Sequence, residues 1–525
     1  MILAGCTALP ELNDRESSQA LTTSHTSDTP LGKTIKPLAQ EHPGDSGIYL
    51  LSDPHEAFAV RTLLADAAQK TLDVQYYIWR NDLTGTLMMD SLRAAADRGV
   101  RVRVLLDDSA GVGFDEVLAT LDAHDNIEVR LFNPLAIRFP RWLNYIVDFQ
   151  RVNRRMHNKS FTVDSQATII GGRNIGDEYF AATTDFQFSD LDVIAVGPVV
   201  GDVASDFDAY WNSESAYPVS LLIPSAQPEA LTKLKQDAIT TKANPQAREF
   251  ITAMHDSNLI TELINGNINL EWAPTRMISD DPGKVLDLAT PDRTVAAQLE
   301  QILGEPESHI ELVSSYFVPT RSGTRILTEL AERGVSIRIL TNSLSATDVA
   351  AVHAGYAKRR RPLLQAGIEL YEMRANPDGP SRRHLRSSGS GRHARFRTWR
   401  WGLAGVPSGS GPFRGASTSL HAKTLSIDDR QIFVGSFNFD PRSAELNTEL
   451  GFIIDSPPLS KLLTRTFMDE VPRTSYQVHL DKDGELYWTT RTNGDTVRFD
   501  TEPEASLWRR VWVGMLSTLP IEWML

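Results

Sequence analysis

The sequence predicts an α/β protein built from two similar lobes, and three observations support this. Strand-like and helix-like segments alternate along the chain from about residue 47, which favours mixed sheets flanked by helices. The segment LRAAADRGVRVRVLLDD of the first half returns as LTELAERGVSIRILTNS in the second. A polar motif also recurs with its spacing unchanged. The economical explanation is a duplicated lobe.

The periodicity of apolar residues predicts the same order of elements in both halves. In the first half we expect strands at 71–78, 100–106 and 127–132, with helices at 84–98 and 114–123. In the second half we expect a strand at 310–317, a helix at 323–333 and a strand at 335–340. The halves are therefore expected to fold alike.

Composition shifts predict five segments. Residues before about 47 are rich in Ser, Thr, Pro and charge, which is typical of a flexible tether, and a middle stretch carries no motif and is expected to pack between the lobes. The predicted segments are a leader at 1–46, lobe one at 47–218, the inter-lobe region at 219–305, lobe two at 306–480 and a tail at 481–525.

Length and charge exclude several classes of protein. A chain of 525 residues is long enough for two or more domains with sizeable cores. The net charge of -14 argues against a nucleic-acid groove over the whole surface, so we predict no nucleic-acid partner. One cysteine, Cys6, excludes an intrachain disulfide and a cysteine-based zinc cage. No apolar run is long enough to span a bilayer, so any membrane attachment is expected to be peripheral or covalent.

The chemistry of the chain lies in a motif that is written twice. Each copy reads H-x-K-x-x-x-x-D, then six residues, then G-(G/S)-x-N. A single H-x-K is weak evidence for a catalytic site. A histidine with only a structural role would not explain why all the intervals of the motif recur in the second copy. The paired positions are His157 and His421, Lys159 and Lys423, Asp164 and Asp428, Gly171 and Gly435, Gly172 and Ser436, and Asn174 and Asn438.

The spacing also predicts local geometry. On a strand, residues two apart point to the same face, so each His and Lys are expected to face one site. Gly and Asn after the following strand mark a turn at which the backbone can approach a ligand.

The repeated motif resembles that of the phospholipase D superfamily, in which two such halves share one active site. Other segments are similar to bacterial cardiolipin synthases of the C type, namely LDVQYYIW, RLFNP, NRRMHNKSFTVD, GGRNIGD, SYFVPTRSG, LTNSLSATDVAAVHAGYAKRR and GSFNFDPRSAELNTELGF. The resemblance implies two phospholipase D-like lobes packed with pseudo-twofold symmetry around one active site. It also implies that His157 is the nucleophile and His421 the general acid, although the sequence alone does not distinguish them.

The residue types suit attack on a phosphodiester. A neutral imidazole can attack phosphorus, and a protonated one can donate a proton to the departing alkoxide. Cations and amide groups can stabilise charge on the phosphoryl oxygens, as a metal does in other enzymes. We therefore predict no metal or other cofactor, and we assign phosphate binding to Lys159, Lys423, Asn174 and Asn438.

Each histidine also needs a carboxylate that fixes its tautomer. Asp190 and Glu449 stand at equivalent places, at the start of a strand after each motif, and are predicted to orient the histidines. Glu178 is a weaker choice. Asp164 and Asp428, the acidic members of the two catalytic motifs, are expected to brace the local turn.

The resemblance implies transfer of a phosphatidyl group from phosphatidylethanolamine or phosphatidylglycerol to phosphatidylglycerol, through a phosphohistidine. For the C-type enzymes the implied donor is phosphatidylethanolamine. Two alternatives remain open: hydrolysis to phosphatidic acid, and a binding protein with a decayed site. A small partner protein is also left open. An apolar site must exclude water for transfer to win over hydrolysis. The aromatic residues near the strand ends, for lining or for core packing, are Tyr76, Tyr77, Trp79, Tyr316 and Phe317.

Several segments bear on the membrane, and we predict a peripheral protein of the bacterial inner membrane. LAGC at 3–6 is similar to a lipoprotein cleavage box, which favours an anchor at Cys6 if translation starts upstream; a chance match is the alternative. Residues 134–149 and 506–525 suit either the lipid interface or packing within the protein. The Arg-, Gly- and Ser-rich stretch 380–416 is either a headgroup-binding insert or a sequence artefact.

Overall fold

The computed structural model describes residues 9–13, 15–110, 114–182, 187–227, 229–255, 262–263, 265–303, 306–375, 418–492, 495–519 and 524. Cys6 and the Arg-rich stretch 380–416 lie outside these ranges, so the alternatives for both remain as stated above.

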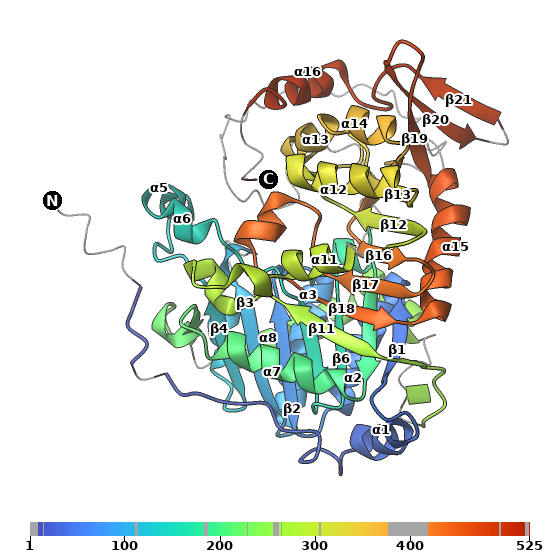
Figure 1. The fold of residues 1–525 in the computed structure, drawn as a ribbon. Coiled ribbons are helices and arrows are strands. Elements are labelled where there is room, and N and C mark those ends of the chain that lie inside the picture. The colour runs from blue at the N-terminus through green and yellow to red at the C-terminus, as the bar shows by residue number, and fades with distance from the viewer. Residues whose placement is uncertain are drawn as a thin grey trace.

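Two large mixed sheets organise the described residues, and each belongs to one half of the chain (Figure 1). In Figure 1 lobe one lies below, in blue to green, and lobe two lies above, in yellow to red. The sheet of lobe one has the order β10(Glu271–Ala273), β1(Ser46–Leu51), β8(Asp192–Val196), β6(Ala167–Gly171), β5(Ser160–Val163), β2(Thr71–Tyr76), β3(Arg101–Asp107), β4(Ile127–Phe132), β9(Ala216–Pro218).

The sheet of lobe two repeats the central part of this order. Its strands are β11(Thr275–Ser279), β18(Leu450–Asp455), β17(Gln431–Gly435), β16(Lys423–Ile427), β12(His309–Ser314), β13(Ser336–Asn342), β14(Glu369–Met373), β19(Ser475–Leu480), β20(Leu486–Thr492), β21(Asp495–Phe499). The run β8-β6-β5-β2-β3-β4 thus corresponds to β18-β17-β16-β12-β13-β14. In both, the strand that follows the motif His pairs antiparallel with the first strand of a parallel trio. The predicted duplication of an α/β lobe is confirmed.

Helices cover the sheets, and local sequence explains where some begin. The Asp53 side chain accepts the backbone N–H of Glu56 at the start of α2, and Asp82 accepts that of Gly85 at the start of α3. The helices are α1(Pro30–Glu41), α2(Pro54–Ala67), α3(Leu83–Asp97), α4(Asp115–Asp122), α5(Asn144–Val147), α6(Phe149–Val152), α7(Val199–Trp211), α8(Ala230–Ala243), α9(Pro245–His255), α11(Val295–Leu303), α12(Thr320–Glu332), α13(Ala350–Ala357), α14(Arg360–Gln365), α15(Pro457–Thr474) and α16(Leu507–Leu516).

The lobes meet through an apolar layer of their own. Each lobe has a large core between its sheet and helices. A third cluster joins side chains from both sheets, including Ile170 and Val193 of lobe one and Val434 and Phe452 of lobe two. Burial of this shared layer stabilises the contact between the lobes. The glycines of the two motifs, Gly171 and Gly435, directly follow residues of this layer.

The leader differs from the expected flexible tether. Residues from Arg15 onward lie along lobe one, where Arg103 donates to the Ser18 carbonyl and Gln166 donates to the Thr23 carbonyl. Helix α1 then buries Leu31 and Ile35 in the core of lobe one. The polar composition was misleading because the leader's backbone groups find partners on lobe one.

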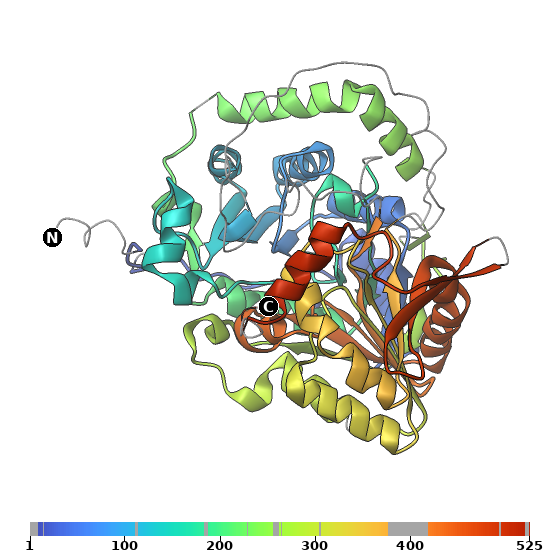
Figure 2. The same cartoon turned by 90° about the horizontal axis from the view of Figure 1, so that it is seen from above.

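The middle region is divided between the lobes rather than forming a layer between them. Helix α8 packs on α3 and α4 of lobe one and stands outside them when the molecule is seen from above (Figure 2). Strand β10 joins the sheet of lobe one, and β11, one residue later, joins that of lobe two. The chain therefore crosses between lobes at Pro274.

Two exposed apolar faces match segments predicted to meet either lipid or protein. Around α5, Phe139 is 90% exposed and Ile146 69%, together with Trp142 and Val147. Helix α16 packs on α13 through Val513 but exposes Trp508 at 77% and Trp512 at 45%. No helix in the described part of the chain combines the length and apolar character needed to cross a bilayer.

Candidate active site

Each motif histidine is fixed by the backbone of the opposite lobe. The His157 N–H donates to the Thr448 carbonyl at 2.8 Å, and the His421 N–H donates to the Ser189 carbonyl at 2.7 Å. Short parallel pairings accompany these bonds: Met156 with Thr448, and β15(Thr418–Leu420) with β7(Gln187–Ser189). The two motifs therefore approach the lobe boundary in the same way.

The carboxylates that orient the histidines are exchanged between the lobes. Nδ1 of His157 lies 2.9 Å from Oε2 of Glu449, and Nδ1 of His421 lies 2.6 Å from Oδ2 of Asp190. The sequence pointed to both carboxylates, but it did not indicate that each serves the other lobe's histidine. Because both Nδ1 atoms are engaged, Nε2 of each ring is left to meet a substrate.

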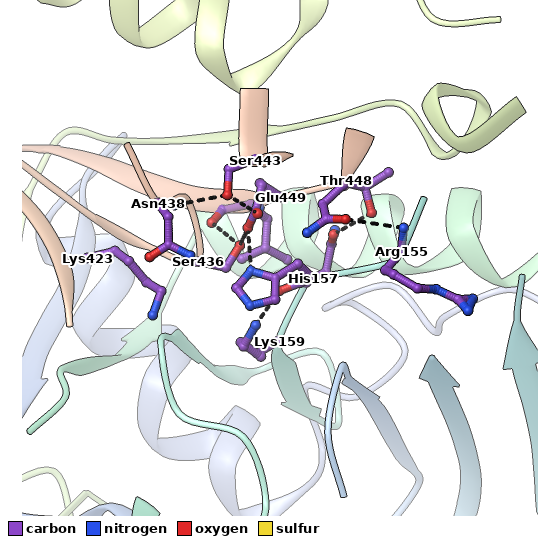
Figure 3. A network of polar contacts seen from close by, with 12 residues as sticks. Arg155, His157, Lys159, Lys423, Ser436, Asn438, Ser443, Thr448 and Glu449 are labelled. Atoms are coloured by element: carbon purple, nitrogen blue, oxygen red, sulfur yellow. Dashed lines mark hydrogen bonds and ion pairs between the residues drawn. The ribbon is translucent and has the colours of Figure 1, made fainter. Parts of the chain in front are cut away.

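Both lysines of the motifs lie at this boundary. Figure 3 shows Lys159 and Lys423, from different lobes, beside the His157 ring. Lys159 donates to the His157 carbonyl, and Lys423 donates to the His421 carbonyl. Burial lowers the pKa of both ammonium groups, most strongly for Lys159, and the charge of Lys423 lowers the pKa of Lys159 further. Two buried cations beside the same histidine form a site suited to an anion.

The imidazoles are tuned to the neutral form. Burial and the two lysines lower the pKa of His157 well below its usual value, and burial with Lys423 lowers that of His421 to about 3. Burial opposes ionisation of Asp190, yet His421 and Lys423 keep its pKa below the usual range. Burial raises the pKa of Glu449 to about 7. A bound phosphate would offset the lysine charges and raise the pKa of both imidazoles.

Both motif asparagines end beside the site. Oδ1 of Asn174 accepts the Ile78 N–H at 3.0 Å, and its amide donates to the Tyr179 hydroxyl at 3.0 Å. Oδ1 of Asn438 accepts the Ser315 hydroxyl at 2.7 Å. Both carbonyl oxygens are thus bound by protein donors, which fixes the direction of each amide N–H.

The motif aspartates lie at the far ends of their strands. Asp164 accepts the backbone N–H groups of Gln69, Lys70 and Thr71. Asp428 accepts those of residues 307–309 and the Ser308 hydroxyl. The structure brings neither aspartate to the histidines, and the contacts are those of a turn brace.

Two serine hydroxyls surround Glu449 beside His157 (Figure 3). The Ser436 hydroxyl donates to Oε2 of Glu449 and the Ser443 hydroxyl donates to Oε1 at 2.8 Å. At the position equivalent to Ser436, a Cβ on Gly172 would lie 2.1 Å from Oδ1 of Asp190. The small Gly172 therefore leaves room for Asp190, and Ser436 at the equivalent position binds Glu449.

Two positioning residues were missed by the sequence analysis. Oδ2 of Asp107 accepts the Met156 N–H at 2.8 Å, and Oδ1 of Asn342 accepts the Leu420 N–H at 2.8 Å. Met156 and Leu420 each precede a motif histidine. Asp107 and Asn342 occupy the same place in the repeated segments ending VLLDD and ILTNS, and this alignment could have revealed them.

The middle region supplies a third missed group. Oδ2 of Asp280 accepts the Glu449 N–H at 2.9 Å and the Lys284 ammonium at 3.0 Å. The Lys284 ammonium also donates to the Ser443 carbonyl at 3.0 Å. No repeat or motif marked these residues.

The predicted aromatic residues separate into two groups. Tyr76, Trp79 and Phe317 are buried in the cores. The Tyr77 ring lies edge-on to His157 at 4.9 Å, and Tyr316 donates its hydroxyl to Asp348. Among the described residues, no group of His, Cys, Asp and Glu side chains has the geometry of a metal site.

Comparisons with known proteins agree with this geometry. A family model described as "Cardiolipin synthase, PLD-like domain" matches residues 62–211, 299–387 and 397–470. The chain is 45% identical to cardiolipin synthase C of Escherichia coli over 94% of its length and 99% of that protein. It is 24% identical to cardiolipin synthase 1 of Bacillus anthracis, over 80% of its length and 65% of that protein.

A solved structure supports the fold. The phosphatidylserine synthase of Haemophilus influenzae superposes with a TM-score of 0.56 at 14% identity, covering 94% of this chain and 99% of that one. With two lobes of shared topology and the motifs joined at their boundary, the chain belongs to the cardiolipin synthase family with PLD-like domains, and it is an enzyme of the phospholipase D superfamily.

Proposed function

We propose that the protein is a phosphatidyltransferase that makes cardiolipin. The observation that carries this proposal is the pair of histidines held by carboxylates of opposite lobes, each with Nε2 unengaged by its carboxylate, next to two buried lysines. This arrangement suits an anionic phosphodiester bound between two imidazoles.

In the first step, Nε2 of His157 attacks the phosphorus of the donor phospholipid. A P–N bond forms, the P–O bond to the headgroup breaks, and His421 gives its proton to the departing alkoxide. The ammonium groups of Lys159 and Lys423 and the amides of Asn174 and Asn438 stabilise the charge on the phosphoryl oxygens.

In the second step, a hydroxyl of phosphatidylglycerol attacks the phosphohistidine. His421 takes the hydroxyl proton, the P–N bond breaks, and cardiolipin leaves with His157 regenerated. One phosphodiester replaces another, so no nucleotide is consumed. The donor is phosphatidylethanolamine or phosphatidylglycerol.

Labelled phosphatidylglycerol in vesicles, with and without phosphatidylethanolamine, tests the reaction. We expect labelled cardiolipin, and label on the protein after quenching that is stable in base and lost in acid, as a phosphohistidine is. His157→Ala should remove that label, whereas His25→Ala, at an exposed histidine, should keep it. Release of phosphatidic acid without cardiolipin would instead establish the hydrolytic alternative.

We also propose that the exposed faces around α5 and α16 rest on the bilayer that supplies the substrates. Trp508 and Trp512 with Arg509 and Arg510 suit the interface between water and lipid. Replacing Phe139 and Ile146, or Trp508 and Trp512, by Ser should lower binding to phosphatidylglycerol vesicles in flotation without lowering the melting temperature. Unchanged flotation of both variants would exclude this surface.

A further inference from the structure

The loop 343–349 follows β13, whose last residue, Asn342, holds the neighbour of His421. Asn342, at the end of β13, binds both backbone groups of Leu420: it accepts the N–H at 2.8 Å and donates to the carbonyl at 2.9 Å. Leu420 directly precedes His421. In addition, Arg509 of α16 donates to the Thr347 carbonyl at 2.6 Å, so the loop is held from both sides.

This loop carries an accessible carboxylate, that of Asp348. The Tyr316 hydroxyl donates to it, with both oxygens at 2.9 Å. The Asp348 side chain is exposed, whereas those of Asp190 and Glu449 are fully buried and engaged with the histidines. Asp348 therefore remains available to a ligand.

The carboxylate lies close enough to the active site for Lys423 to act on it. Desolvation by the surrounding protein raises the pKa of Asp348, and the charge of Lys423 counteracts this rise. On the same side of the site, the rings of Tyr179 and Phe188 lie 5.2 and 4.9 Å from the His421 ring.

The reaction decides which part of the substrate comes near Asp348. In an in-line displacement the attacking and leaving groups lie on opposite sides of the phosphorus. With His157 attacking and His421 donating the proton, the donor's headgroup must leave on the His421 side. The groups on that side are a carboxylate, a phenol and aromatic rings, which attract cations and accept hydrogen bonds.

We propose that Asp348, held by Tyr316, binds the hydrogen-bond-donating end of the departing headgroup and thereby selects the donor phospholipid. This inference rests on the proposed function, because it needs His421 to be the proton donor. Both an ammonium group and a glycerol hydroxyl can donate to the carboxylate. The ammonium of phosphatidylethanolamine makes the stronger, charge-assisted bond.

The experiment measures initial rates with two vesicle compositions, one of phosphatidylglycerol alone and one with phosphatidylethanolamine added. Release of glycerol and of ethanolamine reports which donor was used. For Asp348→Asn we expect kcat/KM for ethanolamine release to fall about ten- to a hundred-fold, and glycerol release to fall only a few-fold. Tyr316→Phe should give a smaller change of the same kind, and Asp348→Glu should restore part of the preference. Asp469→Asn, at an exposed helical position of lobe two, is the matched control.

The outcomes separate the two proposals. Cardiolipin from the wild type, with an unchanged ratio of ethanolamine to glycerol release in Asp348→Asn, overturns only the assignment of Asp348. An equal loss with both donors, accompanied by a lower melting temperature, also overturns it, because a structural role would then suffice. No cardiolipin from the wild type with either composition overturns the proposed function itself.

Discussion

The surroundings of the two histidines differ more than the repeated motif suggests. His157 faces Glu449, whose oxygens accept hydroxyls from Ser436 and Ser443 and whose pKa burial raises to about 7. His421 faces Asp190, whose pKa His421 and Lys423 keep below its usual range. His157 thus faces a carboxyl group with a pKa near 7, and His421 faces a carboxylate that stays ionised.

This difference favours distinct roles that the motif alone leaves symmetric. An ionised carboxylate stabilises an imidazolium, so the Asp190 side suits the histidine that must carry a proton. A nucleophile needs its neutral ring oriented, which the hydrogen-bonded Glu449 can provide without a full negative charge. Five predictions follow the comparison, from the largest expected effect to the smallest.

The histidines can be separated by changing the leaving group. His157→Ala should lose nearly all activity with any donor, because no other group replaces the nucleophile. His421→Ala should lose about 10²- to 10⁴-fold with phosphatidylethanolamine, but far less with phosphatidyl-p-nitrophenol, whose leaving group needs no proton. Release of p-nitrophenol measures this. If His157→Ala were the variant rescued by the activated donor, the two roles would have to be exchanged.

Substitution of the two orienting carboxylates should give the same dependence on the leaving group, with smaller losses of activity than substitution of the histidines. Asp190→Asn and Glu449→Gln should each lower kcat on the order of 10²-fold. The activated donor should rescue Asp190→Asn more than Glu449→Gln, and equal rescue would remove the proposed asymmetry.

Glu449 should also give a signature in stability. Its folded-state pKa of about 7 lies above the usual value of 4.5 for a glutamate, so its contribution to stability is present below about pH 4.5 and is lost as the pH rises through about 7. Glu449→Gln has no such titration. We therefore expect the variant to gain melting temperature relative to the wild type as the pH rises from about 4.5 to about 7, while it stays less active. A constant difference across this range would contradict the raised pKa.

Asp107 and Asn342, which bind the residues before the two histidines, should contribute unequally to the free energy of unfolding. Asp107 also pairs with the buried Arg155, at 3.1 Å, whereas Asn342 binds Leu420 without a charge. Asp107→Ala should lower the free energy of unfolding by about 3–5 kcal/mol, because it leaves a buried cation unpaired. Asn342→Ala should cost about 1–3 kcal/mol. Urea unfolding checks both, and equal costs would mean that the Arg155 pair contributes little.

The smallest effects should come from the G-(G/S) positions. Ser436→Gly removes one hydrogen bond to Glu449 and should cost about 1 kcal/mol. Gly172→Ser must displace Asp190, since its Cβ would lie 2.1 Å from Oδ1, and should cost about 1–3 kcal/mol with a loss of activity. Thermal unfolding and kcat measure both. A harmless Gly172→Ser would show that the Asp190 side adapts easily.

Local patterns predicted the lobes and the residues that carry the chemistry. The equal intervals from His157 to Asn174 and from His421 to Asn438 follow from strand periodicity and turns, which a sequence records directly. The boundaries of β4, at 127–132, agree with prediction, and other predicted elements shift by a few residues at their ends.

The contacts between lobes could not be predicted in this way. Glu449 reaches His157 and Asp190 reaches His421 because the sheets pack through a shared apolar layer, and no local pattern encodes that packing. Asp280 and Lys284 were missed for a related reason: they belong to a segment present once, so no second copy marked them.

The exchange of carboxylates also suggests how such a site arose. When two identical subunits form a symmetric dimer, each can place a carboxylate next to the histidine of the other. Covalent fusion of such a pair would free each copy to mutate separately, as Gly172 and Ser436 have done. It would also mean that neither half, expressed alone, contains a complete set of catalytic groups.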